Sequence, residues 1–196
     1  RELAAASPSP EEVGGKARHL GLLCAAGLPV PDGFVLPAGG PALRLASRQT
    51  RAGSARPADA WGEVSAAAAR LGPVLAVRSS SAVEDLAEGA APGLFSSRLD
   101  IRPEDLAQAV TDVLRSAEGA AVRAYLERRG LGGTPPALAV IVQRQAGGAG
   151  AAHGVLYTRP PGQPDGDEIW IEAARANGLP STAVAPRPGA PPLGRD

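Results

Sequence analysis

The stretch VLAVRSSSAVEDLAEGAAPGLFSSRL, residues Val74–Leu99, decides how the rest of the chain is interpreted. It opens with a short apolar run whose length and β-branched content predict a buried strand. Arg78 and three serines follow, and a stretch rich in Gly, Ala and Pro then leads to a second strand near Ser97. A guanidinium fork matches phosphate oxygens, and glycines let backbone N–H groups approach them closely. This order predicts that the end of the first strand grips a polyphosphate.

The same residues also fit a structural interpretation, which stays open at this point. An arginine at the end of a buried strand needs a partner, and Glu84 or Asp85 could supply it in an ion pair. The three serines, residues 79–81, can cap a turn as readily as they contact phosphate.

Composition limits the classes of function. The chain has 196 residues, with 20 Lys+Arg balanced by 20 Asp+Glu and only 3% aromatic residues. Such a chain has room for one substantial domain or two small lobes. The charge balance and the scarcity of aromatic residues argue against nucleic-acid and membrane-surface partners. No signal peptide or membrane span is visible, and the single cysteine, Cys24, cannot form an internal disulfide. We therefore expect a cytoplasmic protein.

A second motif lies near the N-terminus, in VGGKARHLGLLCAAGLPVPDGFVL, residues Val13–Leu36. The pattern predicts a Gly-Gly turn, a helix of about three turns, a connector and a short strand. Lys16 then lies in the first turn of the helix, where the dipole and free N–H groups favour an anion. A lysine there suits a phosphate ligand, although a solvated helix-start lysine is the alternative. A P-loop is excluded because Pro10 and Ala17 stand where it requires glycine and Ser or Thr.

The remaining pattern alternates helices and strands. Residues 1–12 are expected to be poorly ordered, residues 37–57 form a linker, and residues 174–196 lose periodicity. The other predicted elements are helices at Ala58–Leu71, Pro103–Leu114 and Ala120–Arg129, and strands at Ala137–Gln143, Gly154–Thr158 and Glu168–Glu172.

Five blocks occur in an order and spacing that resemble one known family. They are GGKARHLGLLCAAGLPVPDGFVL, LAVRSSSAVEDL, APGLFSSRLDI, LAVIVQR and HGVLYTRPP. Together they resemble the N-terminal ATP-binding domain of phosphoenolpyruvate synthase and pyruvate phosphate dikinase, which glucan water dikinases and rifampin phosphotransferases share. The resemblance covers roughly Val13 to Pro160.

The resemblance implies an α/β (α+β) fold of the ATP-grasp type, with two lobes of mixed sheets and flanking helices around ATP, truncated at the C-terminus. The expected segments are a disordered stretch at 1–12, a phosphate-gripping lobe at 13–101, a second lobe at 102–174 and a Pro/Gly-rich tail at 175–196.

The resemblance also assigns residues to the nucleotide. Lys16 and Arg78 match the cations that grip the ATP phosphates, and Arg78 is expected to be catalytic. Gly93 and Ser97 match the glycine and hydroxyl of the Ala-Gly-x-x-x-Thr loop, and Gln143 matches the hinge glutamine beside the adenine. Two cations and a glycine loop can offset triphosphate charge while positioning the terminal phosphoryl group.

Other parts of the family's machinery have no match in this sequence. The family's Mg²⁺-binding acid comes from a segment well after Pro160, so the Mg²⁺ ligands are expected outside this chain and no metal site is predicted within it. The phosphohistidine domain or subunit that receives the phosphate is likewise expected as a partner, in cis or in trans. Arg144 and Gln145 stand where relatives place more apolar hinge residues.

Two functional hypotheses follow. In the first, the chain is the ATP-binding portion of a dikinase-type phosphotransferase, a kinase that passes ATP phosphate to a histidine on another domain or chain. In the second, it is a shortened, catalytically inactive module that senses nucleotide or binds a partner. The first hypothesis requires Lys16 and Arg78 to converge on the tail of one bound nucleotide.

Overall fold

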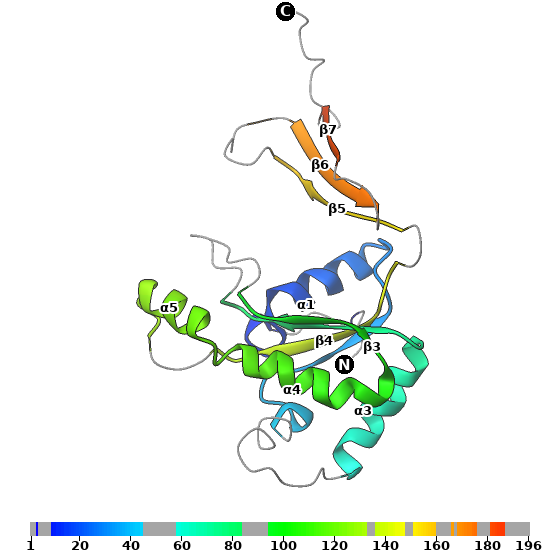
Figure 1. The fold of residues 1–196 in the computed structure, drawn as a ribbon, viewed down its shortest axis with the longest axis vertical. Coiled ribbons are helices and arrows are strands. Elements are labelled where there is room, and N and C mark those ends of the chain that lie inside the picture. The colour runs from blue at the N-terminus through cyan, green and yellow to red at the C-terminus, as the bar shows by residue number, and fades with distance from the viewer. Residues whose placement is uncertain are drawn as a thin grey trace, which may run out of the picture. The chain divides into compact units, whose positions relative to one another are not determined.

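The structure, a computed structural model, describes residues 3, 9–44, 58–83, 94–132, 136–147, 151–159, 166, 168–175 and 181–186. The chain divides into two compact units, Arg1–Gln145 and Ala146–Asp196. Unit 1 combines a four-stranded sheet with helices, and unit 2 contains a three-stranded sheet (Figure 1). The fold is therefore of the α+β class.

The bounds of the described elements are as follows. Unit 1 has helices α1 (Pro10–Ala25), α3 (Ala58–Leu71), α4 (Leu106–Ser116) and α5 (Ala120–Arg128), and a short 3₁₀ helix η1 (Pro103–Asp105). Its strands are β1 (Gly33–Leu36), β2 (Leu75–Ser80), β3 (Ser97–Ile101) and β4 (Ala139–Arg144). Unit 2 has strands β5 (Ala152–Tyr157), β6 (Glu168–Arg175) and β7 (Ser181–Pro186).

Strand β4 organises the sheet of unit 1. The strand order is β1-β4-β2-β3, and Val140, Ile141 and Val142 of β4 are completely buried. This confirms the prediction of a strand buried on both faces. Every pairing of described strands, in both sheets, is antiparallel. The expectation of mixed sheets is therefore wrong for these strands. β1 and β2 run in the same direction, but β4 lies between them and pairs antiparallel with both.

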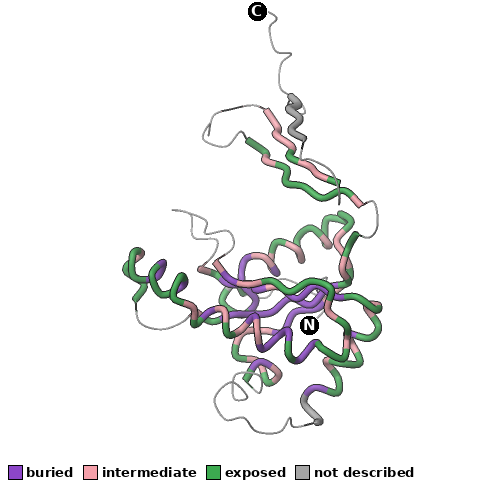
Figure 2. The backbone as a smooth tube through the Cα atoms, in the orientation of Figure 1, coloured by how far each residue is buried: buried purple, intermediate pink, exposed green. Residues whose placement is uncertain are grey.

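The two faces of this sheet carry different helices. Successive residues of a strand point to opposite faces, so Val77 and Val142 share one face while Arg78 and Ile141 share the other. The first face packs against α3 and α4 through the largest core cluster. The second face packs against Val13 and other residues of α1. We call these the α4 face and the α1 face; the buried strands between them form the purple centre of the tube in Figure 2.

Helix α1 is interrupted at Gly14. This residue has φ 74° and ψ 166°, which are not helical values, and the helical backbone continues from Gly15 to Ala25. The Gly-Gly turn followed by a three-turn helix is thus as predicted. A Cβ at Gly14 would collide with the backbone and hydroxyl of Ser80. Glycine is therefore required here both for its backbone conformation and for close approach to β2.

Three expectations differ from the structure. Residues 1–12 are expected to lack order, but α1 begins at Pro10 and Leu3 is buried against the α1 face. The division expected after Ile101 falls inside unit 1, because β3 pairs with β2 and α4 covers the same sheet. The tail expected from residue 175 contains β7, which pairs with β6 through backbone hydrogen bonds that need no apolar periodicity.

Replacement of Gly14 by alanine is expected to destabilise unit 1 more than the same replacement at Gly27. Gly27 has nearly the same φ, 73°, but a Cβ added there would have no neighbouring atom within 4 Å. Gly27→Ala should cost about 1 kcal/mol from backbone strain. Gly14→Ala should cost at least about 1 kcal/mol more, because overpacking against Ser80 adds to the strain of a φ/ψ pair that is essentially restricted to glycine. Urea unfolding of both variants measures the difference. Equal losses of unfolding free energy in the two variants would show that the close approach of Gly14 to Ser80 does not contribute to stability.

Candidate functional site

The turn that carries Lys16 lies directly against the end of β2. The Gly15 N–H donates to the Ser81 carbonyl at 3.4 Å, and the Ala17 N–H donates to Ser80 Oγ at 3.1 Å. Ser80 therefore caps the helical part of α1 from a strand 63 residues away. Lys16, which is half-buried, lies between these two donors. The first turn of α1 is fixed at the end of the strand that also carries Arg78.

Arg78 lies on the α1 face, next to Ser97. It precedes Ser80 by two residues, so both side chains leave β2 on the same face. Arg78 pairs with Ser97 of β3 on one side and with Ile141 of β4 on the other. Residues directly opposite in an antiparallel pair have Cβ atoms about 5 Å apart. Arg78 is half-buried and Ser97 is exposed, so the structure brings together the segments that carry Lys16, Arg78 and Ser97.

The charge of Arg78 is not neutralised within the described part of unit 1. The ion pairs found there join Arg98 to Asp112, Arg102 to Glu104 and Arg144 to Asp32. Glu84 and Asp85, the acids proposed as structural partners of Arg78, lie outside the described residues, as does Gly93. A half-buried guanidinium that has no ion-pair partner among the described residues is well placed to receive an anion.

Gln143 belongs to the same face, farther along β4. It pairs with Ala76 of β2 and Gly33 of β1, and only 4% of its surface is exposed. Its Nε2 donates to the Pro31 carbonyl at 3.0 Å. The side chain therefore holds the connector before β1 in place. Whether it also lies beside an adenine stays a prediction.

Two of the three serines after Arg78 accept backbone N–H groups, a role that the sequence left open. Ser80 Oγ accepts the Ala17 N–H, and Ser81 Oγ accepts the Val83 N–H at 3.2 Å. Ser79 points to the α4 face and its buried hydroxyl has no partner among the described residues. Sequence reasoning did not identify Ser80 as a cap for α1, because the two segments are far apart in the chain and no local signal connects them.

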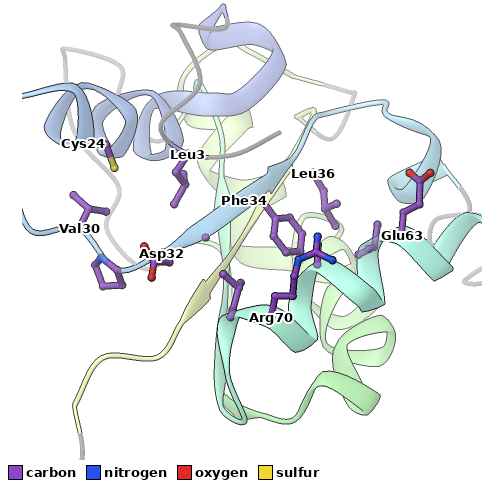
Figure 3. Close-up of a pocket in the computed structure, with 13 residues that line it drawn as sticks. Leu3, Cys24, Val30, Asp32, Phe34, Leu36, Glu63 and Arg70 are labelled. Atoms are coloured by element: carbon purple, nitrogen blue, oxygen red, sulfur yellow. The ribbon is translucent and has the colours of Figure 1, made fainter.

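A pocket of about 670 Å³ lies along the edge strand β1 (Figure 3). Phe34 and Leu36 of β1 contribute to it, with Glu63 and Arg70 of α3. Lys16, Arg78, Ser97 and Gln143 are not among its lining residues. The pocket is thus separate from the predicted nucleotide site, although the two regions meet at Pro31, which lines the pocket and accepts the hydrogen bond from Gln143.

Neither a metal-binding cluster nor a membrane-spanning helix is found among the described residues. Within those ranges, no group of three or more His, Cys, Asp or Glu side chains is arranged to hold a metal ion. None of the helices described has the length and hydropathy needed to cross a membrane.

Comparison with known proteins identifies a family whose model matches this chain. The family model described as pyruvate phosphate dikinase, AMP/ATP-binding domain, matches residues 53–187, which is more than half of the chain. The matched region contains Arg78, Gly93, Ser97 and Gln143 and begins after Lys16. No curated protein matches the chain.

Removal of the Ser80 hydroxyl is expected to loosen α1 at a specific position. Ser80→Ala should cost about 1 kcal/mol, as loss of a helix cap does, and should speed hydrogen exchange of the Ala17 amide. Ser81→Ala is the matched control, because it removes a neighbouring buried hydroxyl that accepts from Val83 instead. NMR-detected exchange should show each variant affecting its own amide. An unchanged Ala17 amide in Ser80→Ala would contradict the capping role.

Proposed function

The chain belongs to the pyruvate phosphate dikinase AMP/ATP-binding domain family, and on this premise we propose that the α1 face beside β2 and β3 binds the phosphates of ATP. The observation that carries the proposal is the pairing of Arg78 with Ser97 on the face against which the turn with Lys16 is fixed. This arrangement offers two cations and a hydroxyl to one ligand, as a polyphosphate requires.

Each residue has a distinct role in this proposal. Arg78 contacts the phosphoryl group being transferred and stabilises the charge that develops on its oxygens. Lys16 offsets charge on the phosphate chain, and Ser97 donates a hydrogen bond to it. Gly93 lets the backbone approach the phosphates, while Gln143 lies at the edge of the adenine site. Because β2 lies between two paired strands, Arg78 is held on a rigid element, which favours accurate positioning.

The overall architecture and the phosphate acceptor are proposed from membership of the family. We propose an ATP-grasp arrangement of two lobes, with a histidine on another domain or chain as phosphate acceptor. When bound, Mg²⁺ would neutralise part of the phosphate charge. Its ligands are proposed to lie outside this chain.

Calorimetric titration with ATP and Mg²⁺ tests the assignment. Arg78→Ala and Lys16→Ala should each weaken binding about 10- to 100-fold, as expected for the loss of a charge-assisted hydrogen bond. Two controls remove a similar charge elsewhere. Arg98→Ala removes the arginine of β3 that pairs with Val77 of β2, next to the Arg78–Ser97 pair. Arg98 lies on the α4 face, where its guanidinium is 3.5 Å from the Asp112 carboxylate. Arg18→Ala changes the next cation along α1.

The controls should bind ATP within about twofold of the unaltered protein, because Arg98 lies on the α4 face and Arg18, two positions after Lys16, leaves the helix on a different side from Lys16. Equal affinity in all four variants would refute the site. A uniform loss in all four would instead indicate a general electrostatic effect and would also refute the assigned residues.

A further inference from the structure

Strand β3 contains one extra residue, which decides the side chains that face the proposed phosphate site. Leu75 of β2 pairs with Ile101, but Val77 pairs with Arg98, so two residues of β3 stand opposite one residue of β2. Such an insertion is a β-bulge. Because side chains alternate between the faces of a sheet, a shift of one residue turns the side chains of a strand to the other face. The bulge therefore sets the faces on which residues 97 and 98 lie.

Contacts on the α4 face show the effect of the bulge. Arg98 and Ile101 are three positions apart, so a regular strand would direct them to opposite faces. Here both lie on the α4 face. The Arg98 guanidinium is 3.5 Å from the Asp112 carboxylate of α4, and Ile101 packs against the core cluster on that face. The extra residue between them makes both contacts possible.

A pairing without the extra residue would bring two arginines together. Counted on from the Leu75–Ile101 pair, a regular antiparallel register leads to different neighbours. It places Arg98 opposite Arg78 and turns Ser97 to the α4 face. Like charges directly opposite each other destabilise a strand pair. With the bulge, Ser97 stands opposite Arg78 instead. The bulge thus decides whether a hydroxyl or a second cation accompanies Arg78.

The side chain of Gln145 holds one of the two bulged residues, Asp100. Asp100 has φ 56°, in the left-handed region, which aspartate adopts more readily than most residues. A bulge leaves its extra residue outside the regular ladder, and the Asp100 N–H donates to Gln145 Oε1 at 2.7 Å. Gln145 Nε2 in turn donates to Asp100 Oδ1 at 2.8 Å. One carboxamide thus binds both the backbone and the side chain of the bulged residue.

The backbone of Gln145 is itself held by the sheet of unit 1. Its N–H donates to the Val74 carbonyl at 3.0 Å, which continues the β2–β4 pairing past the Leu75–Arg144 pair. The Arg144 N–H donates to the Asp32 carbonyl at 2.9 Å. Residues 144–145 are therefore fixed to the segments before β1 and before β2. Gln145 binds the bulge of β3 from this fixed position.

We propose that Gln145 and Asp100 are positioning residues that hold the bulge of β3, and with it the register that places Ser97 beside Arg78 on the α1 face. They act through the pairing of β3 with β2 and are assigned no contact with ATP. The register is a property of the protein without ligand. Its use in phosphate binding rests on the proposed function, in which Ser97 donates a hydrogen bond to the phosphate chain.

Nuclear Overhauser contacts between backbone protons test the register directly. The contact between residues 78 and 97 reports the pairing of β2 with β3, and the contact between residues 78 and 141 is an internal reference from the β2–β4 pair. Gln145→Ala removes both hydrogen bonds to Asp100 and adds no charge. The 78–97 contact should be lost or strongly weakened, while the 78–141 contact stays. ATP affinity should fall about 3- to 10-fold, as expected when one hydrogen bond is lost.

An exchange of donor and acceptor should rescue the register. Gln145→Glu alone sets a second carboxylate against Asp100 and should weaken the 78–97 contact. In Gln145→Glu combined with Asp100→Asn, the asparagine amide can donate to the new carboxylate, and the backbone N–H of residue 100 is retained. This double variant should show the contact at the intensity of the unaltered protein.

The matched control is Gln108→Ala. It makes the same change at a glutamine whose Nε2 also donates to an aspartate, Asp112, at 2.9 Å on α4. It should leave the 78–97 contact and the ATP affinity unchanged.

The 78–97 contact decides the proposal without reference to ATP. An unaltered contact in Gln145→Ala, or an equal loss in Gln108→Ala, overturns it, as does failure of the double variant to restore the contact. Near-ultraviolet circular dichroism checks that each variant is folded. If Gln145→Ala does not fold, the comparison of Gln145→Glu with the double variant decides.

ATP titration of Ser97→Ala separates the two proposals. A lost contact in Gln145→Ala together with full ATP affinity in Ser97→Ala would support the positioning role and refute the role that the proposed function gives to Ser97. An unaltered contact together with weakened binding in Ser97→Ala would overturn the positioning role and leave the phosphate site supported.

Discussion

The contact between the first turn of α1 and the end of β2 is the constraint on which the rest of unit 1 depends. Gly14 allows the two backbones to meet, and Ser80 Oγ accepts the Ala17 N–H at 3.1 Å. A helix N-terminus needs acceptors for its first N–H groups, and here a neighbouring strand provides one. The same contact fixes Lys16 relative to the strand of Arg78. The hydrogen bonds that pack α1 against the sheet therefore also position the residues of the proposed phosphate site.

Strand β4 gives the sheet of unit 1 two faces, one used for packing and one that carries the proposed phosphate site. By lying between β1 and β2, it buries apolar side chains on both of its faces and gives the sheet two distinct surfaces. The α4 face packs against α3 and α4, and the opposite face packs against α1. Arg78 is half-buried on that opposite face, and Ser97 beside it is exposed. A charged group on a central strand is tolerated there because part of its surface still contacts solvent.

Family membership and geometry support different parts of the functional proposal. The family match at residues 53–187 contains Arg78, Ser97 and Gln143, while Lys16 precedes it. The case for Lys16 therefore rests on the hydrogen bonds that fix its turn at β2. At the other end of the sheet, Gln145 makes two hydrogen bonds to Asp100 of β3.

The sequence by itself determined the elements whose signals are local. The apolar run of β4, the periodicity of α3 and α4 and the Gly-Gly turn of α1 were all predictable, since propensity and burial pattern act over a few residues. The five motif blocks also identified the family. Tertiary structure alone decided that Ser80 caps α1, that Gln143 binds the Pro31 carbonyl and that Gln145 binds Asp100. These hydrogen bonds join residues 45 to 112 positions apart, and a donor finds a distant acceptor only when the sheet has set both in place.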